Sequence, residues 1–319
     1  MLAAPVMSTS DAKRQPEPFC QCWHQRAPVP WQQLDPCNCG EILGSDCEWT
    51  WDEPAISGPG WLALSEDKRQ VTFHPFYSAG TAVIKGDTPF LLNTHYYWEV
   101  KILTEAYGTD IIIGMGTSKL DITSARFLFT SLLGKNGESY GLSYTGVLRH
   151  NDQEVPESVG FCRGTIVGVR VDMWRGTLEY YLNRQPQGIS FYNLRRHKVL
   201  YPMISSTAAQ SSVRLVYAGS WRGSLLVDAL KILASSVSPK KRLELPPGLM
   251  FTSTSQFWLT LPTDGQVKEE PKPPAPKESA RSYYTACRCR TRGCASARAW
   301  RMQEHPRFPL APNAVPRNA

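Results

Sequence analysis

The strongest constraint on the fold is a series of short segments in which apolar residues recur at every second position. The clearest covers residues 94–102, where two sets of side chains alternate: Tyr96, Trp98, Val100 and Ile102 against Tyr97, Glu99 and Lys101. Successive side chains of a β-strand point to opposite faces of its sheet, so the pattern predicts a strand with one apolar and one solvated face. Residues 71–74 and 213–217 predict shorter strands, and the apolar run at 110–116 predicts a buried one.

Residues 164–191 form the clearest predicted hairpin. Two valine- and tyrosine-rich segments are separated by 172–177, and the second is followed by 183–188; both connections contain residues typical of turns. Short strands at regular spacing with turns between them predict an all-β protein built as an antiparallel β-sandwich.

A different period begins after this block. Apolar residues at Leu225, Ala229, Ile232 and Leu233 have helical spacing, and Ser224 is a suitable N-cap. A short amphipathic helix must bury its apolar face either on its own domain or on a partner. The spacing alone leaves both possibilities open.

The charge of the chain is concentrated at one end. Of the formal net charge of +7, residues 262–319 supply 11 Lys and Arg against 5 Asp and Glu, so the predicted sandwich is nearly neutral. This balance argues against a nucleic-acid partner, which requires a clustered basic face. The sequence has no apolar run of about 18 residues, so no membrane association is expected. Nine cysteines with no leader-like start favour a reducing compartment, the cytoplasm and/or the nucleus.

Several segments in the predicted sandwich resemble the SPRY domain in the same order: 94–100, 139–142, 167–172, 176–178 and 200–203. The helical segment that follows resembles a SOCS box, so the chain resembles the SPRY domain-containing SOCS box proteins. The chain is therefore expected to have four parts. Composition predicts a disordered Cys- and Pro-rich arm (1–45) and a disordered basic tail (263–319). The resemblance implies a SPRY domain (46–218) and a short α-helical SOCS box (219–262) between them.

The resemblance also implies a function. Members of this family are non-catalytic substrate adaptors of cullin–RING ubiquitin ligases. The SPRY domain binds a short, Asn-containing peptide of a target protein, which is then ubiquitinated and degraded. The SOCS box binds elongin C of the elongin B/elongin C pair, and a following Leu-Pro element recruits a cullin, usually cullin-5, with its RING protein. No cofactor is implied.

Site residues are carried over from the family position by position. The elongin-binding residues are Leu225, Ala229 and Leu233, where Ala229 replaces the usual Cys. The cullin-binding residues are Leu243, Leu245, Pro246 and Pro247, with Glu244 where the family has Pro. The peptide-binding residues are Tyr77, Ser78, Gly108, Thr109, Phe129, Leu132, Thr207 and Ala208. Well-characterised members have Tyr at position 129 and Trp at position 208, so a related but distinct motif is expected.

Three alternatives accompany this interpretation. The chain could be a stand-alone SPRY interaction module whose C-terminal helix is structural. It could be an enzyme, although no nucleophile–base pair is evident by spacing and Cys162 is better explained as a buried or edge thiol. The N-terminal cysteines and histidine could bind zinc, although reduced thiols in a flexible arm are the expectation adopted and no metal site is assigned: Cys20, Cys22, His24, Cys37 and Cys39. Cys287, Cys289 and Cys294 are expected to be solvated.

Overall fold

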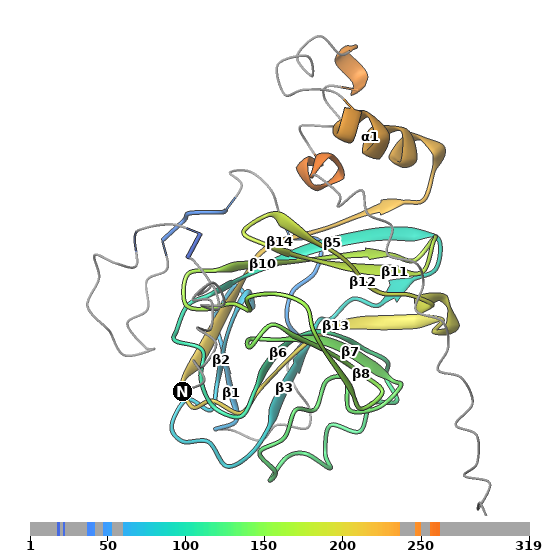
Figure 1. The fold of residues 1–319 in the computed structure, drawn as a ribbon. Helices are drawn as coiled ribbons and strands as arrows, with labels where there is room; N and C mark the ends of the chain where they lie inside the picture. The colour runs from blue at the N-terminus through green and yellow to red at the C-terminus, as the bar shows by residue number, and fades with distance from the viewer. Residues whose placement is uncertain are drawn as a thin grey trace, which may run out of the picture. The chain divides into compact units, whose positions relative to one another are not determined.

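The computed structural model describes residues 18–19, 22, 37–41, 47–52, 60–236, 246–249 and 256–261. Two antiparallel seven-stranded sheets pack face to face, which confirms the predicted β-sandwich (Figure 1). The first sheet has the order β1 (Leu62–Leu64), β2 (Gln70–Phe73), β14 (Ser211–Arg222), β5 (Thr94–Ile102), β10 (Ile166–Asp172), β11 (Thr177–Leu182) and β12 (Gln185–Phe191).

The second sheet has the order β3 (Ala82–Lys85), β13 (Val199–Ser206), β6 (Ile111–Gly116), β7 (Ser139–Ser143), β8 (Val147–His150) and β9 (Gln153–Pro156), with β4 (Phe90–Leu91) beside β13. The described helices include η3 (Leu194–Arg196), α1 (Leu225–Ser236) and η5 (Phe257–Thr260), and residues 247–249 are also helical. None of the helices in the described segments has the length and apolarity needed to cross a membrane.

The predicted hairpin at 164–191 is confirmed. Strands β10 and β11 pair in register from Val167 opposite Leu182 to Asp172 opposite Thr177. The Asp172 carboxylate accepts the backbone N–H groups of Trp174 and Arg175, which closes the turn. Gly176 has a φ of 83°, a conformation that is costly for a side chain, so glycine suits this position.

Three tryptophans form the centre of the sandwich core. The rings of Trp49 and Trp51 lie 5.6 and 6.1 Å from that of Trp98, in edge-on contacts typical of aromatic pairs. The indole N–H of Trp51 donates to the carbonyl of Arg69 at 3.1 Å. Residues 47–52 are therefore part of the sandwich.

The prediction of a solvated second face on β5 is wrong. Tyr97, Glu99 and Lys101 are fully buried, like the residues that face the core. Glu99 accepts a hydrogen bond from the Tyr97 hydroxyl at 2.6 Å and forms an ion pair with Arg184 at 2.9 Å. Burial raises the pKa of the Tyr97 hydroxyl, and the adjacent Glu99 carboxylate raises it further. Segments from before and after the sandwich cover this face, and a strand's own sequence contains no information about them.

One covering segment comes from the predicted disordered arm. Residues 37–41 lie on the outer face of β5, where the ammonium group of Lys101 donates to the carbonyls of Cys37 and Cys39 at 3.0 and 2.9 Å. Arg184 donates to the Gly40 carbonyl at 2.7 Å. Composition predicts disorder for 1–45, but buried charges on the sheet bind these five residues. Most of the arm, and the predicted tail at 263–319, lie outside the described residues.

The other covering segment is C-terminal. Val227 and Leu230 of α1 are buried with Trp258 and Leu259 of η5, in a cluster that also contains tyrosines of the first sheet: Tyr97, Tyr181 and Tyr217. The rings of Tyr97 and Trp258 are parallel, with centroids 5.8 Å apart. The predicted helix is thus present, and one of its faces packs on the sandwich side through η5.

Replacing Arg184 by Met should lower the free energy of unfolding by about 3–5 kcal/mol, because the fully buried Glu99 would lose its cation. Urea unfolding followed by tryptophan fluorescence measures the change. Arg175→Met is the matched control, since Arg175 pairs with Asp228 at 3.0 Å near the surface and should contribute less than about 1 kcal/mol. Equal losses in the two variants would contradict the structural role given to Arg184.

Candidate interaction sites

Four connections meet at one end of the sandwich: 74–81, 103–110, 117–138 and 207–210. Asp110 joins three of them. Its buried carboxylate accepts hydrogen bonds from Ser143 and Ser131, both at 2.6 Å, and lies 3.0 Å from Nε of Arg149. Its backbone N–H donates to the Thr207 hydroxyl, and its carbonyl accepts the Thr207 N–H, both at 3.0 Å. Asp110 therefore links these three connections through its carboxylate and its backbone.

The turn at 75–80 is held in place by hydrogen bonds from side chains in and beside it. His74 is buried with its Nε2 3.1 Å from the Ser206 carbonyl, and burial lowers the pKa of this imidazole. The Ser78 hydroxyl donates to the Thr207 carbonyl at 2.7 Å, and the Thr81 hydroxyl donates to the Leu128 carbonyl at 2.6 Å. These bonds hold the turn beside the segment 126–130.

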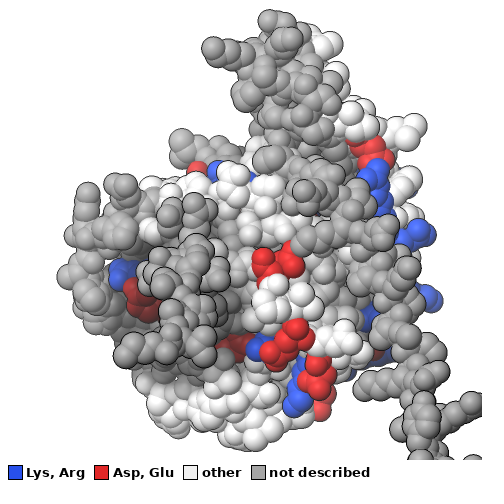
Figure 2. All heavy atoms as spheres, viewed as in Figure 1, with Lys and Arg blue, Asp and Glu red and all other residues white. Residues whose placement is uncertain are grey.

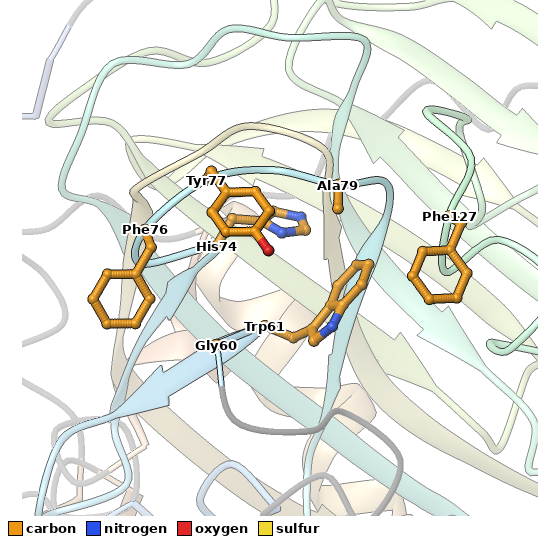
Figure 3. Close-up of a pocket in the computed structure, with 7 residues that line it drawn as sticks. All are labelled: Gly60, Trp61, His74, Phe76, Tyr77, Ala79 and Phe127. Carbon is orange, nitrogen blue, oxygen red and sulfur yellow. The ribbon is translucent and has the colours of Figure 1, made fainter.

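A cavity of about 350 Å³ opens between these two segments. Figure 3 shows aromatic rings from both of them around it; the lining residues are Gly60, Trp61, His74, Phe76, Tyr77, Ala79 and Phe127. Tyr77 is 75% exposed and Phe127 is 71% exposed, which is unusual for large apolar side chains. The guanidinium of Arg126 lies 5.1 Å from the centre of the Trp61 ring. An apolar cavity with one cation at its rim is suited to binding a peptide side chain and a carbonyl beside it.

The eight residues expected to contact peptide divide into two groups. Tyr77, Gly108, Thr109 and Phe129 are exposed, and Ser78 is half-buried. Leu132, Thr207 and Ala208 are buried, which corrects their expected place on a contact surface. Leu132 packs with Val83 and Ala125, and the hydroxyl of Thr207 bonds to Asp110. These three buried side chains lie beneath the loop surface, so they support the loops and do not form a contact surface.

Sequence reasoning missed most of the aromatic rim: Trp61, Phe76, Tyr107 and Phe127. One signal was available. Phe127, Leu128 and Phe129 are three consecutive apolar residues in a region without strand or helix periodicity, and all three are more than half exposed. Such a run in a loop indicates a contact surface when it is not buried.

The second candidate surface is the outer face of α1. Leu225 is 86% exposed and Ile232 is 66% exposed, with Ala229 exposed between them. These residues follow the i, i+4, i+7 spacing of one helical face, opposite the buried Val227 and Leu230. The side chain of Leu233, and all of Leu243 and Leu245, lie outside the described residues, whereas Pro246 and Pro247 are exposed.

Charged side chains on the face seen in Figure 2 are mixed in sign, with acidic and basic groups side by side. Described ion pairs of this kind include Arg149 with Glu154 and Arg175 with Asp228. In this view the described residues show no continuous basic block, in agreement with the near-neutral charge of the sandwich.

Comparison with known proteins shows which families and proteins this chain resembles. The SPRY domain model matches residues 95–219. SPRY domain-containing SOCS box protein 3 from Xenopus laevis and from Xenopus tropicalis are each 39% identical over 253 residues, covering 77% of this chain and 68% of the relative. SPRY domain-containing SOCS box protein 2 from Mus musculus is 31% identical over 134 residues, covering 39% of this chain and 50% of the relative. These findings confirm the resemblance inferred from the sequence.

Asp110→Asn should lower the free energy of unfolding by about 3 kcal/mol, because a buried ion pair and its hydrogen-bond network lose their charge. Urea denaturation provides the measurement. Glu154→Gln tests the other, exposed carboxylate beside the same arginine and should change stability by less than about 1 kcal/mol. A neutral result for Asp110→Asn would show that the loops are not held through this group.

Proposed function

The chain belongs to the family of SPRY domain-containing SOCS box proteins, and from this premise we propose that it is the substrate-recognition adaptor of an elongin–cullin–RING ubiquitin ligase. The observation that carries the proposal is the division of α1 into two apolar faces. One face packs on η5, and the other presents Leu225, Ala229 and Ile232 to solvent.

The sequence leaves open whether the helix packs on its own domain or on a partner, and the two faces of α1 allow both. The helix is attached to the sandwich through Val227 and Leu230, so its position does not depend on a partner. An exposed apolar face at one-turn spacing is the form used in helix-in-groove recognition. The proposed partner is elongin C in complex with elongin B. Ala229 leaves a small side chain at the centre of the face, so a groove can approach the helix backbone there.

Recruitment of the cullin is proposed to involve the segment after α1. Pro246 and Pro247 are exposed, while Leu249 packs against the cluster formed by α1 and η5. This places an exposed Pro-Pro step next to a fixed point of the chain. We propose cullin-5 with its RING protein as the occupant. The adaptor then raises the local concentration of target lysines near a charged ubiquitin-conjugating enzyme, and performs no bond chemistry itself.

Target binding is proposed at the aromatic end of the sandwich. The cavity beside Tyr77 and Phe127 can bury one apolar side chain of an extended peptide. The exposed Gly108–Thr109 step offers backbone groups and a hydroxyl, which suit the amide of an Asn side chain. Nε of Arg126 is buried and has no hydrogen-bond partner among the described residues, so it can donate to a peptide carbonyl. Binding at this end would select proteins for ubiquitination and proteasomal degradation.

Co-expression of the full chain with elongins B and C should give a soluble ternary complex. Leu225→Asp should weaken the complex by at least about 2 kcal/mol, roughly 30-fold, because a charge would enter an apolar groove. Calorimetry on the purified components measures this affinity. Val155→Asp, an equally apolar exposed position on β9, is the matched control and should bind normally. Failure of the unmodified chain to bind elongins would favour the stand-alone interaction module.

Peptides selected by display against the full chain should lose at least roughly 30-fold in affinity when Tyr77 and Phe127 are both replaced by Ala, since exposed aromatics at an interface are frequent hot spots. Fluorescence anisotropy with a labelled selected peptide gives the affinity. Leu91→Ala is the control, because β4 pairs with the opposite end of β13 from Ser206. Unchanged affinity in the double variant would place the peptide site elsewhere.

A further inference from the structure

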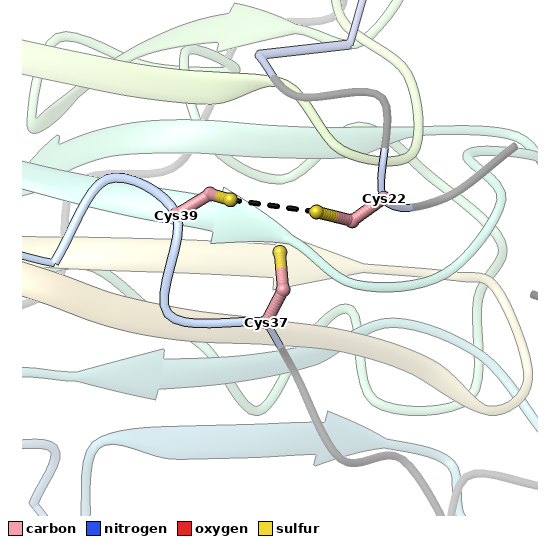
Figure 4. Close-up of side chains that lie close together, drawn as sticks. All are labelled: Cys22, Cys37 and Cys39. Carbon is pink, nitrogen blue, oxygen red and sulfur yellow. Dashed lines mark hydrogen bonds between the residues drawn. The ribbon is translucent and has the colours of Figure 1, made fainter. Parts of the chain in front are cut away.

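Three cysteines meet at the outer face of the first sheet. The sulfur atoms of Cys22, Cys37 and Cys39 all lie within 4.8 Å of one another. Figure 4 shows them converging from two segments of the chain, with Cys22 and Cys39 3.5 Å apart. The chain thus brings together three thiols that are 15 or more positions apart between the two segments.

We propose that Cys22, Cys37 and Cys39 bind a structural zinc ion. In a tetrahedral site with Zn–S bonds of about 2.3 Å, two sulfur atoms are separated by about 3.8 Å. The observed separations of 3.5 Å for one pair and at most 4.8 Å for the others are close to that value. A disulfide requires about 2.05 Å between two sulfurs and leaves the third thiol unexplained. The site is independent of the adaptor function proposed above.

A buried cation supplies the charge balance that such a site requires. Lys101 is fully buried on β5, and its Nζ lies 2.8 Å from the sulfur of Cys37. Three thiolates and one Zn²⁺ carry a net charge of −1, which the lysine ammonium group neutralises. Hydrogen bonds and charges next to metal ligands orient those ligands and adjust the affinity of the site. The ammonium also donates to two backbone carbonyls, and a thiolate at Cys37 would add the opposite charge that stabilises a buried cation.

The backbone around the cluster is already fixed by bonds to the sheet. Lys101 donates to the carbonyls of both Cys37 and Cys39, and Glu41 pairs with Arg214 at 2.9 Å. Gly40, with φ of 90°, lies so close to the sheet that an added Cβ would be 2.2 Å from a methyl group of Ile166. The turn that carries two of the ligands is therefore held in place.

Zinc takes four ligands in structural sites. The sequence offers Cys20 and His24 beside Cys22, and both lie outside the described residues. Two C-x-C pairs are shorter than the usual C-x-x-C spacing, which explains why spacing alone did not assign a metal. The experiment below includes a separate variant for each of these two candidate ligands.

The ion would fasten the chain before the SPRY domain to the sheet that supports α1. Arg184 connects the two regions, because it donates to the Gly40 carbonyl and its guanidinium lies 4.8 Å from the Phe257 ring of η5. Removal of zinc should therefore increase hydrogen exchange in 37–41 and also in 257–261.

The full chain, purified under reducing conditions and analysed by plasma mass spectrometry, should contain about one zinc ion. The double variant Cys37→Ser/Cys39→Ser should lose it, as should Cys22→Ser, whereas Cys47→Ser and Cys162→Ser should retain it. A triple Ser variant at Cys287, Cys289 and Cys294 should also retain it. A zinc-free wild-type chain, or zinc lost only from the tail variant, would overturn the proposal.

A second measurement, made first on the wild-type chain, tests the proposal even if the Cys→Ser variants fail to fold. Cobalt added to the chelated full chain should give thiolate-to-cobalt charge-transfer absorption, which zinc displaces. Lys101→Met should weaken zinc binding roughly tenfold or more, because second-shell partners contribute that much to metal affinity. Single variants Cys20→Ser and His24→Ala identify the fourth ligand by which of them changes the cobalt spectrum. Absence of a thiolate–cobalt band in the wild-type chain would contradict the assignment.

Discussion

The rest of the structure depends on the burial of both faces of β5. Trp98 on one face belongs to the sandwich core, and the opposite face carries Tyr97, Glu99 and Lys101, also fully buried. Two of these, Glu99 and Lys101, are formally charged groups, and a buried charge is costly unless an opposite charge and hydrogen bonds accompany it. The sandwich strands cannot meet all of these needs. The chain before the SPRY domain and the chain after it therefore have to return to this sheet, and each side chain receives its own partner.

This requirement fixes the geometry of the proposed adaptor. Tyr97 stacks on Trp258, and Trp258 in turn packs with the buried side of α1, so the orientation of the helix follows from the outer face of β5. Strand β14 begins at Ser211, next to the aromatic loops, and ends at Arg222, next to α1. Twelve residues at about 3.3 Å each separate the two surfaces by roughly 35–40 Å. A continuous strand between the proposed target site and the helix proposed to bind elongin C transmits position with little flexibility.

The sequence was sufficient for what local periodicity determines. Alternation and an apolar run identified β2, β5, β6 and β14, turn residues identified the hairpin at 164–191, and helical spacing identified α1. Periodicity did not identify the shorter strands β1, β3, β4, β8 and β9. Local periodicity did not predict contacts between distant segments: Lys101 and Cys37 are 64 positions apart, and Arg184 and Glu99 are 85 apart. On β5, alternation with polar residues therefore suggested a solvent-exposed face. In the structure, distant parts of the chain bond to the polar side chains of that face. Transfer of the peptide-site residues from the family included exposed positions such as Tyr77. It could not distinguish them from the buried residues beneath the loops, such as Leu132.

Position 208 shows why the supports matter for specificity. Well-characterised relatives have Trp there, but Ala208 is buried beneath Gly108, where an added Cβ would lie only 3.4 Å from the Ala208 methyl. The Tyr107 hydroxyl donates to the Ala209 carbonyl and closes the two loops over this point. An indole cannot be accommodated without separating them. Contact area in the proposed peptide site must therefore come from other residues, and the exposed rings of Tyr77 and Phe127 are positioned to provide it. The peptide side chain bound most deeply at the proposed site should accordingly lie nearer the 75–80 turn.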